Sequence, residues 1–96
     1  MAFIKVGKKV IALNLYNDGR IYMGKGFREA FEVTPRMSVY ADKEGERLGV
    51  VFEEDGAYST KGRMINTGYS LVVHLDSGRY IFDGQEGEMF VFKKEG

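Results

Sequence analysis

Hydrophobic residues recur at every second position through most of this chain, and glycine-containing turns separate the alternating segments. That period is typical of strands with one buried face. The alternating residues are Ile11, Leu13, Leu15, Ile21 and Met23, then Met37, Val39, Ala41, Leu48, Val50 and Phe52, then Tyr69, Leu71, Val73, Leu75, Tyr80, Phe82, Phe90 and Phe92. The chain is therefore expected to be mainly β.

Four turns divide these strands. Residues 17–19 (Asn-Asp-Gly) suit a type I′ turn and predict a first hairpin, and residues 42–45 (Asp-Lys-Glu-Gly) predict a second. Turns at 76–78 and 83–87 connect the strands of the C-terminal half. That half is predicted to be a meander whose first strand covers 69–75.

One segment, 26–32, has the pattern of a helix. Phe27 and Phe31 lie four positions apart and so share a helical face. Thr34 and Pro35 end it, because the residue before a proline avoids the helical conformation. About seven short antiparallel strands and this one short helix predict a sheet sandwich or a small barrel, since each half-polar strand must bury its other face.

The length predicts a single domain over 1–96, because 96 residues bury one ordinary core and no more. Its expected parts are a hairpin-helix-hairpin half (1–53), a loop (54–68) and the meander half (69–96). The loop has weak periodicity, with one irregular strand expected around 62–65.

The chain contains no cysteine, so disulfides, a thiolate nucleophile and cysteine-based zinc sites are excluded. Its first residues interrupt a short apolar run with lysines, unlike a signal peptide, and no apolar stretch approaches the length of a membrane span. A cytoplasmic protein is the expectation.

Charge differs between the two halves although the formal net charge is zero. Residues 1–48 carry nine Lys and Arg against six Asp and Glu, and residues 49–96 carry five against eight, so the halves have charges of +3 and −3. A dedicated duplex-DNA binder usually has a basic surplus. The basic first half can still present a positive face, or it can be an ordinary solvated rim.

The order hairpin turn, strand, one-turn helix and strand over residues 19–42 resembles the AbrB-type swapped-hairpin DNA-binding module. The matching positions are Gly19-Arg20-Ile21, Lys25, Arg28-Glu29-Ala30-Phe31, Val33, Pro35 and Val39. The resemblance implies an interleaved homodimer in which Arg20, Lys25 and Arg28 face DNA. Residues 39–52 also resemble small phage or archaeal proteins of unassigned role.

Six tyrosines and seven phenylalanines exceed what a small core needs. Phe52, Phe90 and Phe92 fall on the apolar faces of their strands, and Phe27 and Phe31 fall on the apolar face of the helix. All five are therefore expected in the core. Tyr22 and Tyr40 alternate with polar residues on the other side of their strands, and Tyr16 lies close to them. Exposed rings beside basic side chains can stack on the bases of a single strand, or they can pack against a protein partner.

No catalytic motif is present. His74, the sole histidine, is expected to be exposed on its strand and lacks a sequence-adjacent nucleophile or carboxylate. Asp83, Glu86 and Glu88 lack the donor spacing of a calcium loop, and residues 24–29 lack the third glycine of a dinucleotide fingerprint. No enzyme activity, cofactor or metal is expected.

Two functions from different classes remain open. The first is a small dimeric nucleic-acid-binding regulator that binds DNA or a single strand, with binding that weakens steeply with salt. Its expected contact residues are Arg20, Lys25, Arg28, Lys8, Lys9, Tyr22 and Tyr40. The second is a non-enzymatic protein-interaction module, such as a phage-encoded modulator of a host protein, that uses an edge strand or the tyrosines.

Overall fold

The computed structural model describes residues 11–31 and 34–95, with the side chain of Lys25 outside that description. Within these ranges eight strands form one antiparallel sheet, and there are two short helices. The strands are β1 (Ala12–Leu15), β2 (Arg20–Met23), β3 (Arg36–Asp42), β4 (Arg47–Phe52), β5 (Tyr58–Ser59), β6 (Met64–Asn66), β7 (Gly78–Glu86) and β8 (Met89–Lys94). The helices are α1 (Lys25–Ala30) and α2 (Tyr69–Val72).

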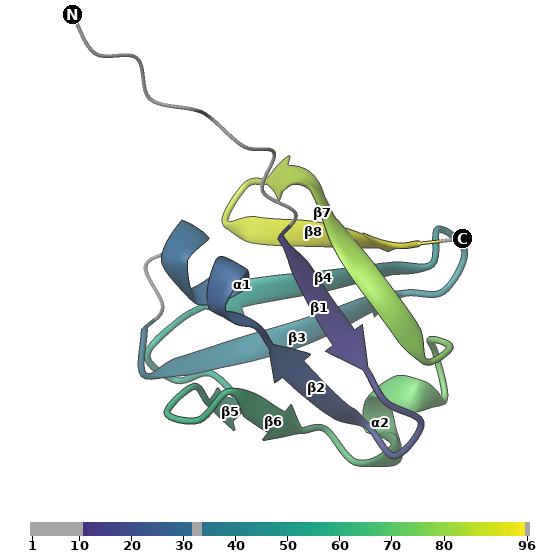
Figure 1. Cartoon of the computed structure of the whole chain (residues 1–96), viewed down its shortest axis with the longest axis horizontal. Helices are drawn as coiled ribbons and strands as arrows, with labels where there is room; N and C mark the ends of the chain where they lie inside the picture. Colours follow the sequence, from purple (N-terminus) through teal and green to yellow (C-terminus); the bar gives the residue numbers. More distant parts are fainter. Residues whose placement is uncertain (1–10, 32–33, 96) are drawn as a thin grey trace, which may run out of the picture.

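The sheet curls into a nearly closed barrel (Figure 1). Its strand order is β5-β3-β4-β8-β7-β1-β2-β6, and the two end strands, β5 and β6, contact each other. The expectation of a mainly β protein is confirmed, and of the two architectures considered the small barrel is found. The sequence predicted about seven strands, whereas the described residues form eight.

The barrel interior is filled by the residues that alternate along the strands. Leu13, Ile21, Met23 and Tyr80 of one half are fully buried, as are the equivalent residues of the other half, Met37, Leu48, Val50 and Phe92. Strand pairing places these side chains on the same face because Leu13 lies opposite both Met23 and Tyr80. Burial of this apolar face is the main force that closes the sheet.

Helix α1 covers one end of the barrel with phenylalanines. Phe27 is fully buried, and Phe31 lies four residues later on the same face, with the two ring centroids 5.2 Å apart. These rings join Phe52, Phe82, Phe90 and Phe92 in a cluster in which the Phe31 and Phe90 centroids are 4.4 Å apart. Of the phenylalanines predicted for the core, Phe27 and Phe92 are fully buried, and Phe31, Phe52 and Phe90 are partly buried and pack against the core.

The prediction that residues 69–75 form the first strand of a meander is wrong. Residues 69–72 form α2, and Leu75 N donates to Leu71 O in a further turn. Leu71 and Leu75 are both buried whereas Val73 is 64% exposed, so a helical spacing and not a spacing of two describes this segment. Helix α2 lies at the end of the barrel opposite α1 (Figure 1). Leu71 and Leu75, one helical turn apart, are both buried there.

Two further boundaries differ from the prediction. The turn expected over 83–87 belongs largely to β7, which continues to Glu86 through a register shift between Phe82 and Gly84, so the hairpin turns only at Gly87 and Glu88. The expected loop 54–68 contains two short strands, β5 and β6, rather than one. Both strands close the barrel, and this role depends on contacts with distant residues.

Candidate nucleic-acid interface

The outward side chains of β7, β1, β2 and β6 form a transverse row across four strands. Arg79 lies opposite Asn14, Asn14 lies opposite Tyr22, and Tyr22 lies opposite Met64. The adjacent residues Leu13, Ile21, Ile65 and Tyr80 are buried, so these four side chains lie on the outer face of the sheet. Arg79 and Met64 are exposed there, and Asn14 and Tyr22 are half-buried. A guanidinium, an amide, a phenol and a thioether are thereby placed side by side.

A second row lies next to the first. Arg20 lies opposite Asn66, and the Arg20 guanidinium carbon is 5.8 Å from the centroid of the Tyr16 ring, which is 43% exposed. The two rows define the Tyr22 face, which consists of Asn14, Tyr16, Arg20, Tyr22, Met64, Asn66 and Arg79. None of the strand residues of the Tyr22 face is an Asp or a Glu. Carboxylates occur instead at the last residue of β3, Asp42, and at the last residue of β7, Glu86.

The carboxylate of Asp18 lies at the edge of the Tyr22 face. Asp18 Oδ1 accepts a hydrogen bond from the Arg20 main-chain N–H at 3.1 Å, and Oδ2 accepts one from Arg20 Nε at 2.7 Å. These interactions hold the pKa of Asp18 below its usual value. Both side chains are about half exposed, at 45% and 50%, so solvent screens the pair and a ligand can reach the guanidinium.

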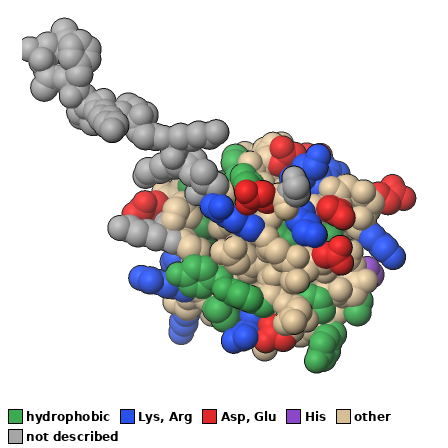
Figure 2. Space-filling model, turned by 45° about the vertical axis from the view of Figure 1, so that its right-hand side comes forward, with side chains coloured by type: hydrophobic (Ala, Val, Ile, Leu, Met, Phe, Trp, Pro, Cys, Tyr) green, Lys and Arg blue, Asp and Glu red, His purple; other side chains and the backbone are tan. Residues whose placement is uncertain are grey.

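Further cations surround this surface. Arg79 Nη1 lies 3.6 Å from Glu95 Oε2, and both side chains are about half exposed. Lys61 and Arg63 are exposed near β6, and no charged partner is recorded for either among the described residues. On the side of the molecule drawn in Figure 2, basic and acidic side chains are interspersed, so the protein has no broad field of one sign there.

Arg28 was expected to be exposed and to face DNA, and its expected exposure is wrong. The side chain is half-buried, and Nη1 donates to the carbonyl oxygens of Thr60, at 2.9 Å, and Gly62, at 3.1 Å. Arg28 therefore ties α1 to the connection between β5 and β6. These carbonyl groups are 32 and 34 residues from Arg28 in the sequence. The local sequence pattern around the helix therefore could not indicate this contact.

Of the remaining predicted contact residues, only Tyr40 has a side chain that the structure describes. Lys8 and Lys9 lie outside the described residues, as does the side chain of Lys25 at the start of α1. Tyr40 is 47% exposed but belongs to β3, opposite Gly49 of β4, and does not share a ladder with Tyr22. The structure therefore brings Arg20, Tyr22 and Tyr16 together and separates Tyr40 from them.

Four residues of the Tyr22 face were missed by sequence reasoning. Met64 and Asn66 belong to a segment of weak periodicity, and Asn14 and Arg79 looked like ordinary polar positions of strands. The available signal was their parity: each alternates with buried residues of its own strand, Leu13 and Leu15 around Asn14, and Ile65 between Met64 and Asn66. Only the pairing of distant strands shows that these positions adjoin.

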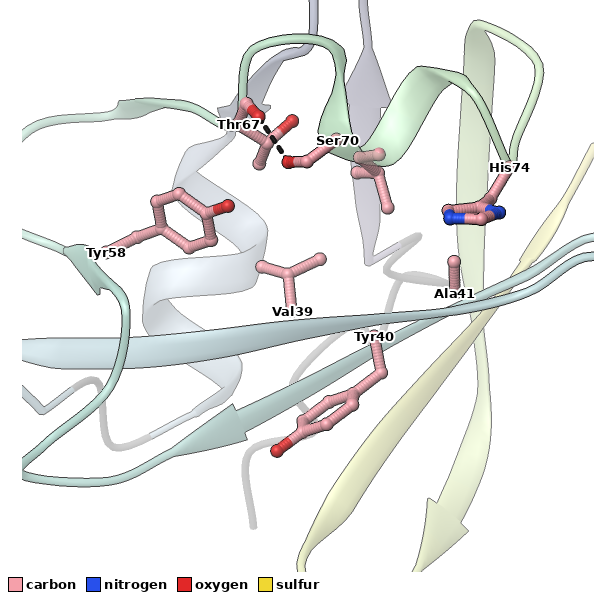
Figure 3. Close-up of a pocket in the computed structure, with 8 residues that line it drawn as sticks. Val39, Tyr40, Ala41, Tyr58, Thr67, Ser70 and His74 are labelled. Carbon is pink, nitrogen blue, oxygen red and sulfur yellow. Dashed lines mark hydrogen bonds between the residues drawn. The ribbon is translucent and has the colours of Figure 1, made fainter.

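A hollow of about 330 Å³ lies between β3 and α2 (Figure 3). We call it the β3 slot, and its lining residues are Val39, Tyr40, Ala41, Tyr58, Thr67, Ser70, Leu71 and His74. His74 was expected on a strand but follows α2, where its side chain is exposed at one end of the slot. Ser70 Oγ donates to Thr67 O at 2.6 Å, so this hydroxyl already serves the turn into α2.

In the described ranges 11–31 and 34–95, no cluster of three His, Asp or Glu residues that could hold a metal ion occurs. In the same ranges, neither helix has the length and apolar character needed to cross a membrane. Comparison with known protein families, with curated proteins and with solved structures gave no match to this chain.

Proposed function

We propose that this protein binds nucleic acid through the Tyr22 face and acts without catalysis. The observation that supports the proposal is the transverse row in which Arg79, Asn14, Tyr22 and Met64 are held side by side by strand pairing. A rigid sheet that presents an aromatic ring between polar side chains is a common platform for an unpaired strand.

Each side-chain type on this face has a use in binding a single strand. Tyr22 and Tyr16 offer rings on which bases can stack, and each such stack contributes on the order of 1–3 kcal/mol. The amides of Asn14 and Asn66 can hydrogen-bond the exposed edges of unpaired bases. Arg20 and Arg79 can contact phosphates, since their ion pairs with Asp18 and Glu95 are solvent-exposed and therefore weak.

The number of available cations sets the salt dependence that we expect. Arg20, Arg79 and Arg63 can together neutralise about three phosphates, which gives a slope of about −2 in log affinity against log salt for a single strand. Affinity would then fall about twentyfold between about 50 and 200 mM salt. Because stacking does not depend on salt in this way, binding would weaken with salt without vanishing.

The resemblance to the AbrB-type module suggests a second form of the same proposal, a cytoplasmic homodimeric regulator that binds duplex DNA. In the single chain, β2 pairs with β1 and β6, and β3 pairs with β4 and β5. The Tyr22 face is thus present in one chain, and a monomer can bind a single strand. Duplex binding would be expected to need two copies on the same site.

Fluorescence-anisotropy titrations against labelled single-stranded DNA, single-stranded RNA and duplex DNA at about 50 and 200 mM salt test this proposal. Tyr22→Ala should weaken binding about tenfold or more, the equivalent of one lost stack. Tyr69→Ala is the matched control, because Tyr69 is 74% exposed on α2 and outside the Tyr22 face. The proposal fails if all three nucleic acids give flat traces at both salt concentrations.

A further inference from the structure

Strand β3 has a neighbour along the whole of one edge but only along the start of the other. Strand β4 pairs with β3 from Met37 to Asp42. Strand β5 pairs only with Arg36 and Met37, because it is two residues long. Among the described residues, the second edge of β3 therefore has no paired strand beyond Met37.

The backbone groups on this edge can be identified from the ladder. Glu53 N donates to Arg36 O on the side of β4, and Thr60 N donates to Pro35 O on the side of β5. Because the hydrogen-bonding direction alternates from residue to residue, the N–H and C=O of Val39 and Ala41 point to the unpaired edge. The part of the chain that the structure describes supplies no hydrogen-bond partner for these four groups.

The unpaired edge borders the β3 slot, whose opposite wall is formed by Leu71 and His74 after the turn at Thr67 (Figure 3). The Tyr58 hydroxyl points into the slot, and no hydrogen-bond partner is recorded for it among the described residues. The slot thus combines an apolar floor with free backbone donors and acceptors.

A second hollow, of about 370 Å³, lies on the outer side of β3. It is lined by Gly49, Met89 and Val91 together with Tyr40 and Ala41 of β3, and by the ion-paired Asp42, Arg47 and Glu86. Tyr40 and Ala41 border both hollows. This hollow lies toward β4 and β8, across Tyr40 from the free edge. A strand laid along the free edge would therefore place alternate side chains in the β3 slot and against Tyr40, because successive side chains of a strand point to opposite sides.

We infer that the β3 slot binds an extended peptide segment of a partner protein as an added strand. The peptide backbone pairs with Val39 and Ala41, and one side chain enters the slot above Leu71 while the next lies against Tyr40. This division of roles, with main-chain bonds for affinity and alternate pockets for selectivity, is that of strand addition. The preferred side chain in the slot is aliphatic, because Val39, Ala41 and Leu71 form its floor.

A second folded copy of this chain fits the slot less well. The slot has a volume of about 330 Å³, and on this edge only Val39 and Ala41, among the described residues, offer free backbone groups. A stable dimer interface normally buries more than about 1,000 Å². The peptide site is separate from the Tyr22 face, so the two activities can be tested independently.

The test is selection of random linear peptides on the immobilised protein, followed by titration of synthetic versions of the enriched sequences. Ala41→Pro is the test variant, because proline removes the N–H that faces the slot and no bond within the sheet. Ala41→Ser is the matched control that keeps this N–H. Binding should weaken at least about tenfold in Ala41→Pro and stay within about twofold in Ala41→Ser.

Amide hydrogen exchange of the unmutated protein tests the same inference without depending on how the proline variant folds. The amides of Val39 and Ala41 should exchange fast in the free protein and at least about tenfold more slowly with a selected peptide bound, whereas those of Tyr40 and Asp42 are protected in both states. Enriched peptides that bind Ala41→Pro equally well, or the absence of any enriched peptide, would overturn the inference. Protection of Val39 and Ala41 that rises with protein concentration would also overturn it, in favour of a second copy.

Discussion

The main chain of Gly68 lies directly against Gly19, so closely that a Cβ atom on Gly19 would be 1.7 Å from the Gly68 carbonyl oxygen. Gly19 also has a φ of +91°, which side chains rarely allow. The neighbouring Thr67 donates from both N and Oγ1 to Gly19 O, at 2.9 and 2.6 Å. This contact fixes the β1–β2 turn to the segment that leads into α2, and thereby holds the two rows of the Tyr22 face next to the end of the barrel.

Gly19→Ala should destabilise the fold by at least about 3 kcal/mol, because it combines backbone strain with displacement of a neighbouring main chain. The control is Gly87→Ala, where φ is +60° but no atom lies within 4 Å of the added Cβ. That variant should cost about 1 kcal/mol. Urea unfolding followed by circular dichroism measures both, and equal costs would show that the Gly19–Gly68 contact is absent.

Leu71→Ala should cost about 2–5 kcal/mol, since it empties a buried position under α2. Val73→Ala should change stability by less than about 0.5 kcal/mol, because Val73 is 64% exposed. A strand over 69–75 would place both side chains on one face and predict similar costs. The ratio of the two unfolding free energies therefore distinguishes the helix from the strand.

The sequence contains the cause of this error. Tyr69, Leu71, Val73 and Leu75 satisfy a period of two, but Leu71 and Leu75 also satisfy the spacing of one helical turn, and β-branched valines favour the first interpretation. Burial against the end of the barrel decided between them, and burial is not a local property. By contrast, β1 to β4 were predictable because their alternation is regular and glycine turns mark their ends.

Arg28→Ala should destabilise the protein by about 1–3 kcal/mol, because it removes two charge-assisted hydrogen bonds that hold the β5–β6 connection to α1. Arg63→Ala, at an exposed position of the same connection, is the matched control and should change stability by less than about 0.5 kcal/mol. Thermal unfolding of the two variants checks this. If Arg28→Ala leaves stability unchanged, the guanidinium is free and the original expectation of an exposed arginine is restored.

Tyr80 should make stability pH-dependent in the alkaline range. Burial, assisted by the carboxylates of Glu46 and Asp76, raises the pKa of Tyr80 from 10.0 to about 12, and the hydroxyl donates to Asp76 O at 2.7 Å. Above pH 10 the unfolded chain loses this proton while the folded chain keeps it, so the stabilising effect is complete below pH 10 and is lost as the pH rises to about 12.

The Tyr80→Phe variant isolates this effect. At pH 7 it should cost about 1 kcal/mol for the lost hydrogen bond. Between pH 10 and 12 the wild-type protein should lose stability more steeply than the variant, so the difference between them shrinks. Chemical unfolding across this range measures the two curves, and parallel curves would contradict the raised pKa.

The candidate site was predictable in part. Strand parity correctly put Tyr22 and Arg20 on the outer side of their strand, and turn geometry put Tyr16 near Arg20. Arg79, Met64 and Asn66 could not be assigned to the same surface because β7 and β6 reach it from more than forty residues away in sequence. Arg28 was wrongly expected to be exposed for the same reason, since its carbonyl partners are 32 and 34 residues distant.

The central claim is that nucleic acid binds on the Tyr22 face, and a titration of the ¹⁵N-labelled protein with an unlabelled single-stranded oligonucleotide, followed by NMR chemical shifts, tests it most directly. We predict that the shift changes concentrate on β1, β2 and β6, above all at Asn14, Tyr22 and Met64, and leave the outward residues of β3 and β4 unchanged. Shift changes centred on β3 and β4, or no shift changes at saturating oligonucleotide, would contradict the claim.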